Sequence, residues 1–376
     1  MTRFHIATTI HQGKGSLSHL ADIGAQRVLV VTDSFMATTP TMDAVRRHLG
    51  RAEITVYDGV TPDPTVTEVS AGVEAYLVSD PDTVIALGGG SPLDAAKAIC
   101  KVAAEHGDAP KNGLVAIPST SGSGSEVTTF AVVTSHNPTR KMVLVSDDMA
   151  PAMAILDPEV TRTLPKSMTA DTGMDAMTHA LESYVCTERN DFSDAFAEKA
   201  SQLIFGNIET ACREPDNLEA RERMHNASAM AAMAFDNSGL GIVHSISHAL
   251  GARFGKPHGR LNAVLLPTVM EFNAGPVTYG PHGISEVADR YAHIAHLIGL
   301  EASTRRNLAL ALCAEIRRIR TAIGIPDTLT GLGIDKAELK AAIPDLVAGA
   351  LEDTCTPPNP VAPTADDLAG IIAKVS

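Results

Sequence analysis

The sequence predicts an α/β domain followed by an all-α domain, and three observations support this division. Short apolar, β-branched runs alternate with amphipathic stretches between about residues 25 and 157. Beyond residue 165 the strand pattern stops, and long helical patterns continue almost to the end. The 376 residues are enough for each part to bury its own core. We therefore expect domains at residues 1–160 and 161–376, with a ligand cleft between them.

The first domain is expected to contain a Rossmann-like parallel sheet. Apolar runs predict its strands at residues 27–31, 53–57, 83–87, 114–117 and 153–156. Runs this short and apolar are typical of strands buried on both faces of a sheet. Amphipathic segments between them, such as residues 65–77 and 92–106, predict the helices of right-handed βαβ crossovers. In the second domain, helical patterns predict helices at residues 167–185, 220–235, 241–254 and 307–324.

Composition excludes several classes of partner. The 44 acidic and 30 basic residues give a net charge of −14, which repels nucleic acid and anionic membrane surfaces. Five cysteines without a CxxC pattern indicate reduced thiols in a cytoplasmic protein. The N-terminal stretch lacks the apolar core of a secretion signal, and no run of about 18 apolar residues occurs. We expect neither export nor a membrane span.

A glycine-rich turn follows the third predicted strand. In TVIALGGGSPLDAAKAI, Gly89, Gly90 and Ser91 stand between a strand and a helix. Backbone N–H groups of such a turn can approach a pyrophosphate, and the helix dipole favours its negative charge. The motif is not GxGxxG and does not follow the first strand, so a plain tight turn is the alternative.

Two further loops begin at strand ends. Asp33 ends VLVVTD, where a carboxylate can accept hydrogen bonds from ribose hydroxyls and repel a 2′-phosphate; a helix N-cap is the alternative. The hydroxyl-rich segment IPSTSGSGSEVTT, residues 117–129, can contact pyrophosphate or carboxamide groups, or can simply be a hairpin connection. Three such loops at the carboxyl ends of strands favour a dinucleotide site. Lys141 offers an additional charge to the ribose or phosphate.

Histidines and one aspartate have spacings that suggest a metal site. Asp175 and His179 are four residues apart on a helical pattern, as are His244 and His248, and His258 follows a Gly-Lys-Pro turn. Neutral imidazoles rarely gather in an apolar environment without a common partner. One carboxylate with three imidazoles suits divalent iron or zinc acting as a Lewis acid. The alternatives are a structural Asp–His pair and histidines that fill a core.

Four stretches carry a resemblance to a known family: ALGGGSPLDAAKAI, AIPSTSGSGSEVT, AILDPEVTRTLPKSMTADTGMDAMTHALESYV and HSISHALGARFGKPHGRLNAVLLPTVMEFN. Through them the chain resembles the iron-containing (group III) alcohol dehydrogenases, and most closely the microcompartment-type 1-propanol dehydrogenases. The resemblance implies a dehydroquinate synthase-like architecture, NAD(H), and Fe²⁺ or else Zn²⁺. The implied reaction is reversible hydride transfer between NAD(H) and a small primary alcohol or aldehyde.

The resemblance also implies roles for individual residues. His248 would lie beside the metal without ligating it and would help to relay a proton. Asp63 stands where relatives often carry asparagine, so a cofactor contact there is in doubt. The implied metal ligands are Asp175, His179, His244 and His258. The implied cofactor contacts are Asp33, Gly89, Gly90, Ser91, Asp94, Ser119, Thr120, Ser123, Thr128 and Lys141.

Other functions remain open at this point. A polyol dehydrogenase of the lactaldehyde, propanediol or glycerol type is the alternative substrate class. A dehydroquinate synthase-like lyase and a non-enzymatic nucleotide-binding protein are the alternatives outside this reaction class. The resemblance also implies a homodimer or larger homo-oligomer in the cytoplasm, either free or with the enzymes or shell of a bacterial microcompartment.

Overall fold

The structure, a computed structural model, describes residues 3–136, 139–275 and 284–376. The packing separates the chain into two compact units. The first, the α/β unit, contains His5–Leu164 and Pro215–Ala229. The second, the helical unit, contains mainly Pro165–Glu214 and Met230–Ser376. The domain boundary between residues 160 and 161 stays a prediction. The segment Pro215–Ala229, from the second half of the chain, groups with the α/β unit.

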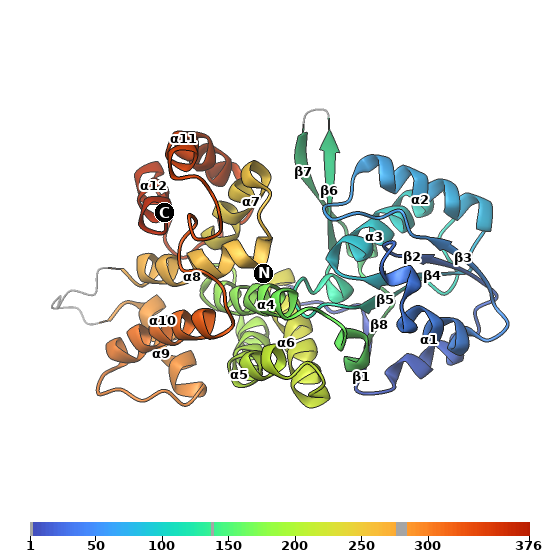
Figure 1. Ribbon diagram of the computed structural model, residues 1–376, viewed down its shortest axis with the longest axis horizontal. Coiled ribbons are helices and arrows are strands. Elements are labelled where there is room, and N and C mark those ends of the chain that lie inside the picture. The colour runs from blue at the N-terminus through green and yellow to red at the C-terminus, as the bar shows by residue number, and fades with distance from the viewer. Residues whose placement is uncertain (1–2, 137–138, 276–283) are drawn as a thin grey trace. The chain divides into compact units, whose positions relative to one another are not determined.

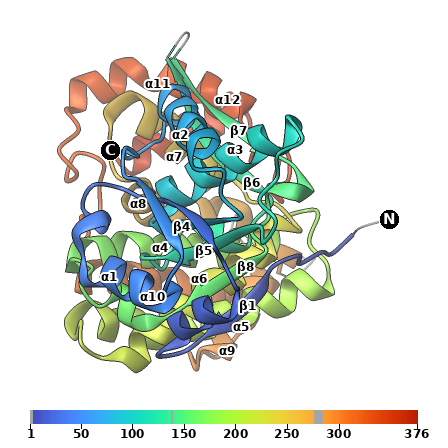
Figure 2. The ribbon, with the colours of Figure 1, turned by 90° about the vertical axis from the view of Figure 1, so that its right-hand side faces the viewer.

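A parallel sheet of six strands forms the centre of the α/β unit (Figure 1). Its strands are β1 (Thr9–Gln12), β2 (Arg27–Val31), β3 (Glu53–Tyr57), β4 (Thr83–Gly88), β5 (Leu114–Pro118) and β8 (Met153–Leu156). They lie in the order β1-β8-β5-β4-β2-β3, with every neighbouring pair parallel, and Figure 2 shows β4, β5 and β8 side by side. The five predicted strands are confirmed; the polar sequence of β1, TIHQ, had not indicated a strand.

Helices cover both faces of this sheet (Figure 1). The covering elements are the 3-10 helix η1 (Ser16–Asp22) and α1 (Pro40–Leu49) on one face, and α2 (Val66–Ser79) and α3 (Gly90–Glu105) on the other. Successive residues of β2 alternate between the faces. Val28 and Val30 pack in the cluster with α1. Leu29 and Val31 pack in the cluster with α2 and α3. Burial on both faces explains the continuous apolar runs of the sequence.

The strand order defines where the α/β unit can bind a ligand. From β2 the chain moves to β3 on one side, and then returns to β4 on the other side of β2. Ligands of such sheets bind outside the carboxyl ends of the strands at which the order reverses. Asp33 follows β2 and Gly89 follows β4, so two of the predicted cofactor loops begin at this switch point.

A separate antiparallel hairpin, which the sequence did not predict, consists of β6 (Phe130–His136) and β7 (Thr139–Val145). Its register pairs Phe130 with Val145. The backbone N–H of Thr134 donates to Pro64 O at 2.7 Å, which fixes β6 beside the loop before α2. The remaining 3-10 helices are η2 (Met36–Thr38), η3 (Ser125–Val127), η4 (Asp147–Met149) and η5 (Pro158–Thr161).

The helical unit is built around α4, which is buried along most of its length. Its helices are α4 (Lys166–Val185), α5 (Asp191–Arg213), α7 (Ile242–Phe254), α8 (His258–Ala274), α9 (Glu286–Leu297), α10 (Arg305–Ala322), α11 (Lys336–Glu352) and α12 (Ala365–Lys374). Helix α6 (Leu218–Asp236) contributes residues to both units. None of the described helices is both long and apolar enough to cross a lipid bilayer. The six-stranded parallel sheet and the helices that follow it in the chain confirm the predicted α/β and all-α architecture.

Candidate metal centre and cofactor loops

Helix α4 supplies three ionisable side chains to the interior of the helical unit. Asp175, His179 and Glu182 follow one another at intervals of four and three residues, which places them on one face of the helix. Their exposures are only 9%, 5% and 4%, respectively. A carboxylate or imidazole that is buried so deeply needs a polar or ionic partner.

The turn between α7 and α8 brings two histidines together. Gly255 adopts a left-handed conformation with φ 62°, which ends α7, and His258 begins α8 directly after Pro257. The rings of His244 and His258 are consequently 5.1 Å apart between centroids. Helix α8 also packs directly on α4, because a Cβ at Gly259 would lie 2.0 Å from Asp171 O.

Three of the predicted metal ligands, all histidines, converge on a carboxylate oxygen of the fourth, Asp175. Nε2 of His179, His244 and His258 lies 3.8, 3.9 and 3.6 Å, respectively, from Asp175 Oδ1. Ligand atoms of Asp175, His244 and His258 all lie within 4.8 Å of one another. A metal bonded to nitrogen and oxygen at about 2.1 Å separates neighbouring ligand atoms by about 3 to 3.5 Å. The cluster is slightly wider than this and can therefore hold one divalent cation.

The protonation of the cluster also fits a cation. Burial, followed by the charges of His179, His258 and His248, lowers the pKa of His244 well below its ordinary value. A neutral imidazole keeps the lone pair that a metal requires. The donor set of one carboxylate and three imidazoles is of the kind that divalent iron and zinc accept.

Asn262, which the sequence analysis did not single out, occupies the centre of this cluster. Its Nδ2 donates to Asp175 Oδ1 at 2.8 Å. The same nitrogen lies 3.4 Å from Nε2 of His244 and 3.2 Å from Nε2 of His258. An amide NH₂ has two N–H bonds, so besides Asp175 it can donate to only one of these two imidazole nitrogens at a time. The amide thus orients the carboxylate, and an imidazole that accepts from it carries its proton on Nδ1.

The Nδ1 atoms of His244 and His258 also have polar partners. Nδ1 of His244 lies 2.5 Å from Glu182 Oε2, and Nδ1 of His258 lies 3.2 Å from Ser247 Oγ. Burial raises the pKa of Glu182, whereas hydrogen bonds from the backbone N–H groups of Val243, Gly241 and His244 lower it by stabilising the carboxylate. Glu182 was missed from the sequence, although its place seven residues after Asp175, on the same helical face, was a usable signal.

His248 belongs to a neighbouring hydrogen-bonded group. Its Nδ1 lies 2.8 Å from Asp353 Oδ2, and Cys355 N donates to Asp353 Oδ1, also at 2.8 Å. Burial raises the pKa of the Cys355 thiol well above its ordinary value. The ring of His248 is 5.1 Å from that of His258. His248 therefore lies beside the metal cluster.

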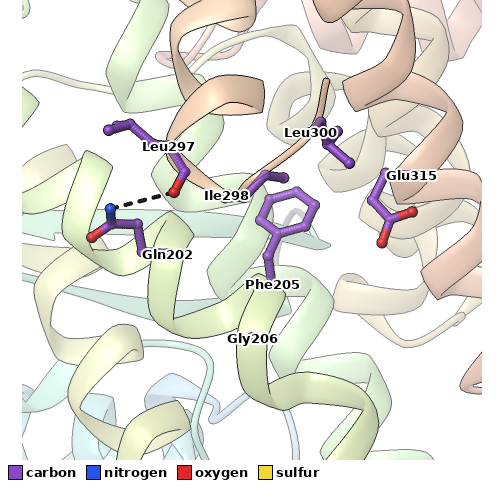
Figure 3. Close-up of a pocket in the computed structure, with 7 residues that line it drawn as sticks. All are labelled: Gln202, Phe205, Gly206, Leu297, Ile298, Leu300 and Glu315. Atoms are coloured by element: carbon purple, nitrogen blue, oxygen red, sulfur yellow. Dashed lines mark hydrogen bonds between the residues drawn. The ribbon is translucent and has the colours of Figure 1, made fainter. Parts of the chain in front are cut away.

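A pocket of about 310 Å³ elsewhere in the helical unit has a different character (Figure 3). Its walls come from α5, from the end of α9 with the segment that follows it, and from α10, and Phe205 points toward Ile298. The carboxylate lining it, Glu315, is paired with Arg318. The pocket therefore lacks the convergent donors found around Asp175.

The glycine turn of the α/β unit packs closely against the hydroxyl-rich loop. A Cβ at Gly89 would lie 3.3 Å from Thr120 Cγ2, and one at Gly90 would lie 3.0 Å from Ser123 Cβ. Ser119 N donates to Gly88 O at 2.7 Å, which ties the two loops together. Side chains at these glycines would close the space in which a phosphate can approach the start of α3.

Asp33 caps the turn that follows β2, and its contact with a ribose stays a prediction. Its Oδ1 accepts hydrogen bonds from the backbone N–H groups of Phe35 and Met36, at 3.0 and 2.8 Å, as a cap would. Its Oδ2 lies 3.5 Å from the place of a Cβ on Gly88. One carboxylate oxygen thus holds the turn, and the other faces the glycine loop.

Asp94 and Thr128, two predicted cofactor contacts, hold the loop itself. Asp94 accepts from Ser125 Oγ at 2.6 Å and from Val132 N at 3.0 Å. Thr128 is fully buried, and its Oγ1 and O accept from Lys97 Nζ at 2.9 and 2.8 Å. Their contact with a cofactor stays a prediction. Lys97, a buried lysine that the sequence analysis missed, therefore supports the loop.

Asp63 connects two further predicted cofactor residues. Lys141 Nζ lies 2.7 Å from Asp63 Oδ1. The backbone N–H of Asp63 donates to Ser91 Oγ at 3.3 Å. Asp63 has φ 59°, a left-handed conformation that asparagine and aspartate tolerate better than most residues. The aspartate thus partly neutralises the lysine that was expected to meet the cofactor.

A doubly wound sheet with phosphate-type loops at its switch point, in one chain with a buried carboxylate–imidazole cluster, defines a metal-dependent dehydrogenase. The comparisons with known proteins agree. The model of the iron-containing alcohol dehydrogenase family matches residues 7–158, and the model of the family's C-terminal domain matches residues 169–376. The chain belongs to the iron-containing alcohol dehydrogenase family.

Relatives with stated activities extend over the whole chain. The 1-propanol dehydrogenase PduQ of Salmonella typhimurium is 37% identical, with all of both chains covered. The NAD-dependent methanol dehydrogenase of Bacillus methanolicus is 36% identical, with 99% of each chain covered. A crystal structure of 1,3-propanediol oxidoreductase is 32% identical, has a TM-score of 0.91 and covers both chains completely. The predicted enzyme class, an alcohol dehydrogenase that uses iron and NAD(H), is confirmed.

Proposed function

We propose that this enzyme interconverts a small primary alcohol and its aldehyde at a metal held by Asp175, His179, His244 and His258. The observation that carries this proposal is the convergence of three imidazole Nε2 atoms within 3.6 to 3.9 Å of Asp175 Oδ1. When bound, Fe²⁺, or Zn²⁺ in its place, supplies Lewis acidity toward the substrate oxygen, and NAD(H) exchanges the hydride. The chain's own residues orient these groups and move the proton.

His248 is the residue that moves the proton. Its Nδ1 faces Asp353, which leaves Nε2 to accept the alcohol proton during oxidation and to return it during aldehyde reduction. Asn262 keeps Asp175 oriented through its 2.8 Å hydrogen bond. Asp175, His179 and His244 are buried, which limits the access of water, whereas the His258 side chain is 33% exposed.

The loops at the switch point hold the dinucleotide. Gly89, Gly90 and Ser91 present backbone and hydroxyl donors to the pyrophosphate at the start of α3. Ser119, Thr120 and Ser123 line the facing loop, which Asp94, Thr128 and Lys97 stabilise. The contacts with the adenosine ribose and the second ribose come from Asp33 and Lys141.

The preference for NAD(H) over NADP(H) follows from Asp33. Its Oδ2 lies beside the glycine loop, where a 2′-phosphate would meet a negative charge. Among the relatives, the butanol dehydrogenase of Clostridium saccharobutylicum is NADPH-dependent and 37% identical, whereas the methanol dehydrogenase is NAD-dependent. Because these relatives use different cofactors, we assign the cofactor preference of this enzyme from Asp33 alone.

A panel of C2 to C4 alcohols, aldehydes and diols, with both cofactors and iron-reconstituted protein, tests the proposal. We expect the highest kcat/KM for a primary alcohol or its aldehyde with NAD(H). Diol oxidation is the second candidate, because 1,3-propanediol oxidoreductase is a structural neighbour at a TM-score of 0.91. A clear preference for a diol selects that candidate. Absence of NADH formation from every substrate overturns both.

Assembly and location are part of the same proposal. From the family resemblance we expect a homodimer or larger homo-oligomer in the cytoplasm, free or packaged with the enzymes or shell of a bacterial microcompartment. Light scattering after size-exclusion chromatography measures the first property. Co-fractionation with shells in the native host measures the second. A monomer contradicts the proposed assembly, and complete absence from isolated shells excludes the packaged form and leaves the free one.

A further inference from the structure

Glu182 lies directly behind the metal cluster and makes two different kinds of contact. Its Oε2 is 2.5 Å from Nδ1 of His244, and its Oε1 accepts from Val243 N at 2.7 Å. The start of α7 approaches this carboxylate so closely that a Cβ at Gly241 would lie 2.8 Å from Oε1. With 4% exposure, Glu182 is shielded from bulk water. Backbone N–H groups at the start of α7 thus hold the carboxylate in place, with Oε2 directed at His244 Nδ1.

These contacts decide which nitrogen of His244 faces the cluster as a lone pair. A neutral imidazole carries one N–H, and the other nitrogen is an acceptor. Glu182 offers Nδ1 an acceptor on one side of the ring. Nε2 lies on the other side of the ring, 3.9 Å from Asp175 Oδ1. The contact with Glu182 favours a proton on Nδ1 and leaves a lone pair on Nε2, on the side where Asp175, His179 and His258 converge.

We propose that Glu182 is a positioning residue that selects the metal-binding tautomer of His244. The inference rests on the proposed metal centre, and it assigns to Glu182 a role that a merely space-filling side chain would not have. A carboxylate behind a ligating histidine fixes the ring and raises the basicity of the ligating nitrogen, and its loss typically lowers metal affinity about 10- to 100-fold.

The substitution Glu182→Gln tests the tautomer directly, because glutamine has nearly the same volume. The amide oxygen has to face Val243 N–H, so the NH₂ group faces Nδ1 of His244. That nitrogen must then be an acceptor, which moves the ring proton to Nε2 and removes the lone pair from the cluster. Glu182→Ala leaves Nδ1 without an imposed partner, so the ring can still adopt the ligating tautomer.

The measurement is the Zn²⁺ affinity of full-length, metal-free protein in competition with a chelator. We expect Glu182→Gln to weaken Zn²⁺ binding by about 100-fold and Glu182→Ala by about 10-fold. The control Glu198→Gln alters a glutamate that accepts from Tyr184 Oη at 2.9 Å and lies 3.2 Å from His293 Nε2, outside the cluster. It should bind Zn²⁺ like the wild type.

The order of the two variants separates the inference from a structural role. If Glu182 only supports packing, the isosteric glutamine binds Zn²⁺ better than alanine does, and the inference is overturned. The Zn²⁺-induced rise in melting temperature gives a second reading, which should be smaller for the Gln variant than for the Ala variant. If the wild-type protein binds no Zn²⁺, the proposed metal centre itself is refuted. If the wild type binds Zn²⁺ tightly and Glu182→Gln binds it with the same affinity, only the role of Glu182 is refuted.

Discussion

Asp353 Oδ2 lies 2.8 Å from Nδ1 of His248, and the other oxygen of this carboxylate accepts from Cys355 N. The contact fixes the ring and presents its Nε2 as the free acceptor. A carboxylate behind a histidine is a familiar arrangement for a group that exchanges protons. It explains how His248 can lie beside the metal cluster and transfer a proton without binding the metal.

Replacing His248 should separate turnover from metal binding. For His248→Asn we expect kcat to fall by about 10²-fold, because a positioned proton-transfer group contributes at least that much. The metal content, measured by elemental analysis, should stay at the wild-type value. His293→Asn, which alters a half-exposed histidine of the same unit, serves as the control. Loss of the metal in the His248 variant would instead make it a ligand.

Replacing a proposed ligand should remove metal and turnover together. In His244→Ala or His258→Ala, one of three imidazoles is lost from a cluster that surrounds Asp175 Oδ1 at 3.6 to 3.9 Å. We expect metal occupancy close to zero and a fall of at least about 10³-fold in kcat/KM. Elemental analysis and initial rates on the same samples measure both. An active variant without metal refutes the ligand assignment.

The charge of Asp33 should control the choice of cofactor. Asp33→Asn retains an oxygen that can cap Phe35 N and Met36 N, but it removes the negative charge beside Gly88. The ratio of kcat/KM for NADP to that for NAD should rise about tenfold, with little change in melting temperature. Asp33→Ala removes both functions and should also lower stability, by about 1 kcal/mol. An unchanged cofactor ratio in both variants contradicts the assignment.

His225 should make the stability of the α/β unit depend on pH. It is fully buried and contacts Ser121 Oγ at 3.0 Å, and burial lowers its pKa from 6.5 to about 4. The unfolded chain takes up this proton near pH 6.5, whereas the folded chain does so only near pH 4. Stability is therefore complete above pH 6.5 and falls, by up to about 3 kcal/mol, as the pH drops toward 4.

The variant His225→Asn isolates this contribution. Asparagine can still hydrogen-bond to Ser121 but does not titrate. The difference in melting temperature between the variant and the wild type should change steadily between pH 7 and 4, in favour of the variant. A constant difference across this range would mean that His225 titrates normally in the folded protein.

Local sequence determined the elements whose signal lies within one segment. The strands around Val30 and Ile85 were predictable because a strand buried on both faces has a continuous apolar run. The edge strand at Thr9–Gln12 and the hairpin that begins at Phe130 were missed. Their residues form strands only because neighbouring strands supply the hydrogen bonds.

The same division holds for the candidate site. Asp175 with His179, and His244 with His248, could be read from the sequence because residues four apart share a helical face. Glu182 shares the helical face of Asp175 and His179, so its position could also have been read locally. Asn262 and Asp353 carried no such signal, since their importance arises from contacts across 87 and 105 residues of sequence. The sequence alone therefore identified which side chains are able to bind a metal. Only tertiary packing decided which nitrogen of each ring faces the cluster, because a tautomer is selected by partners brought together from distant parts of the chain.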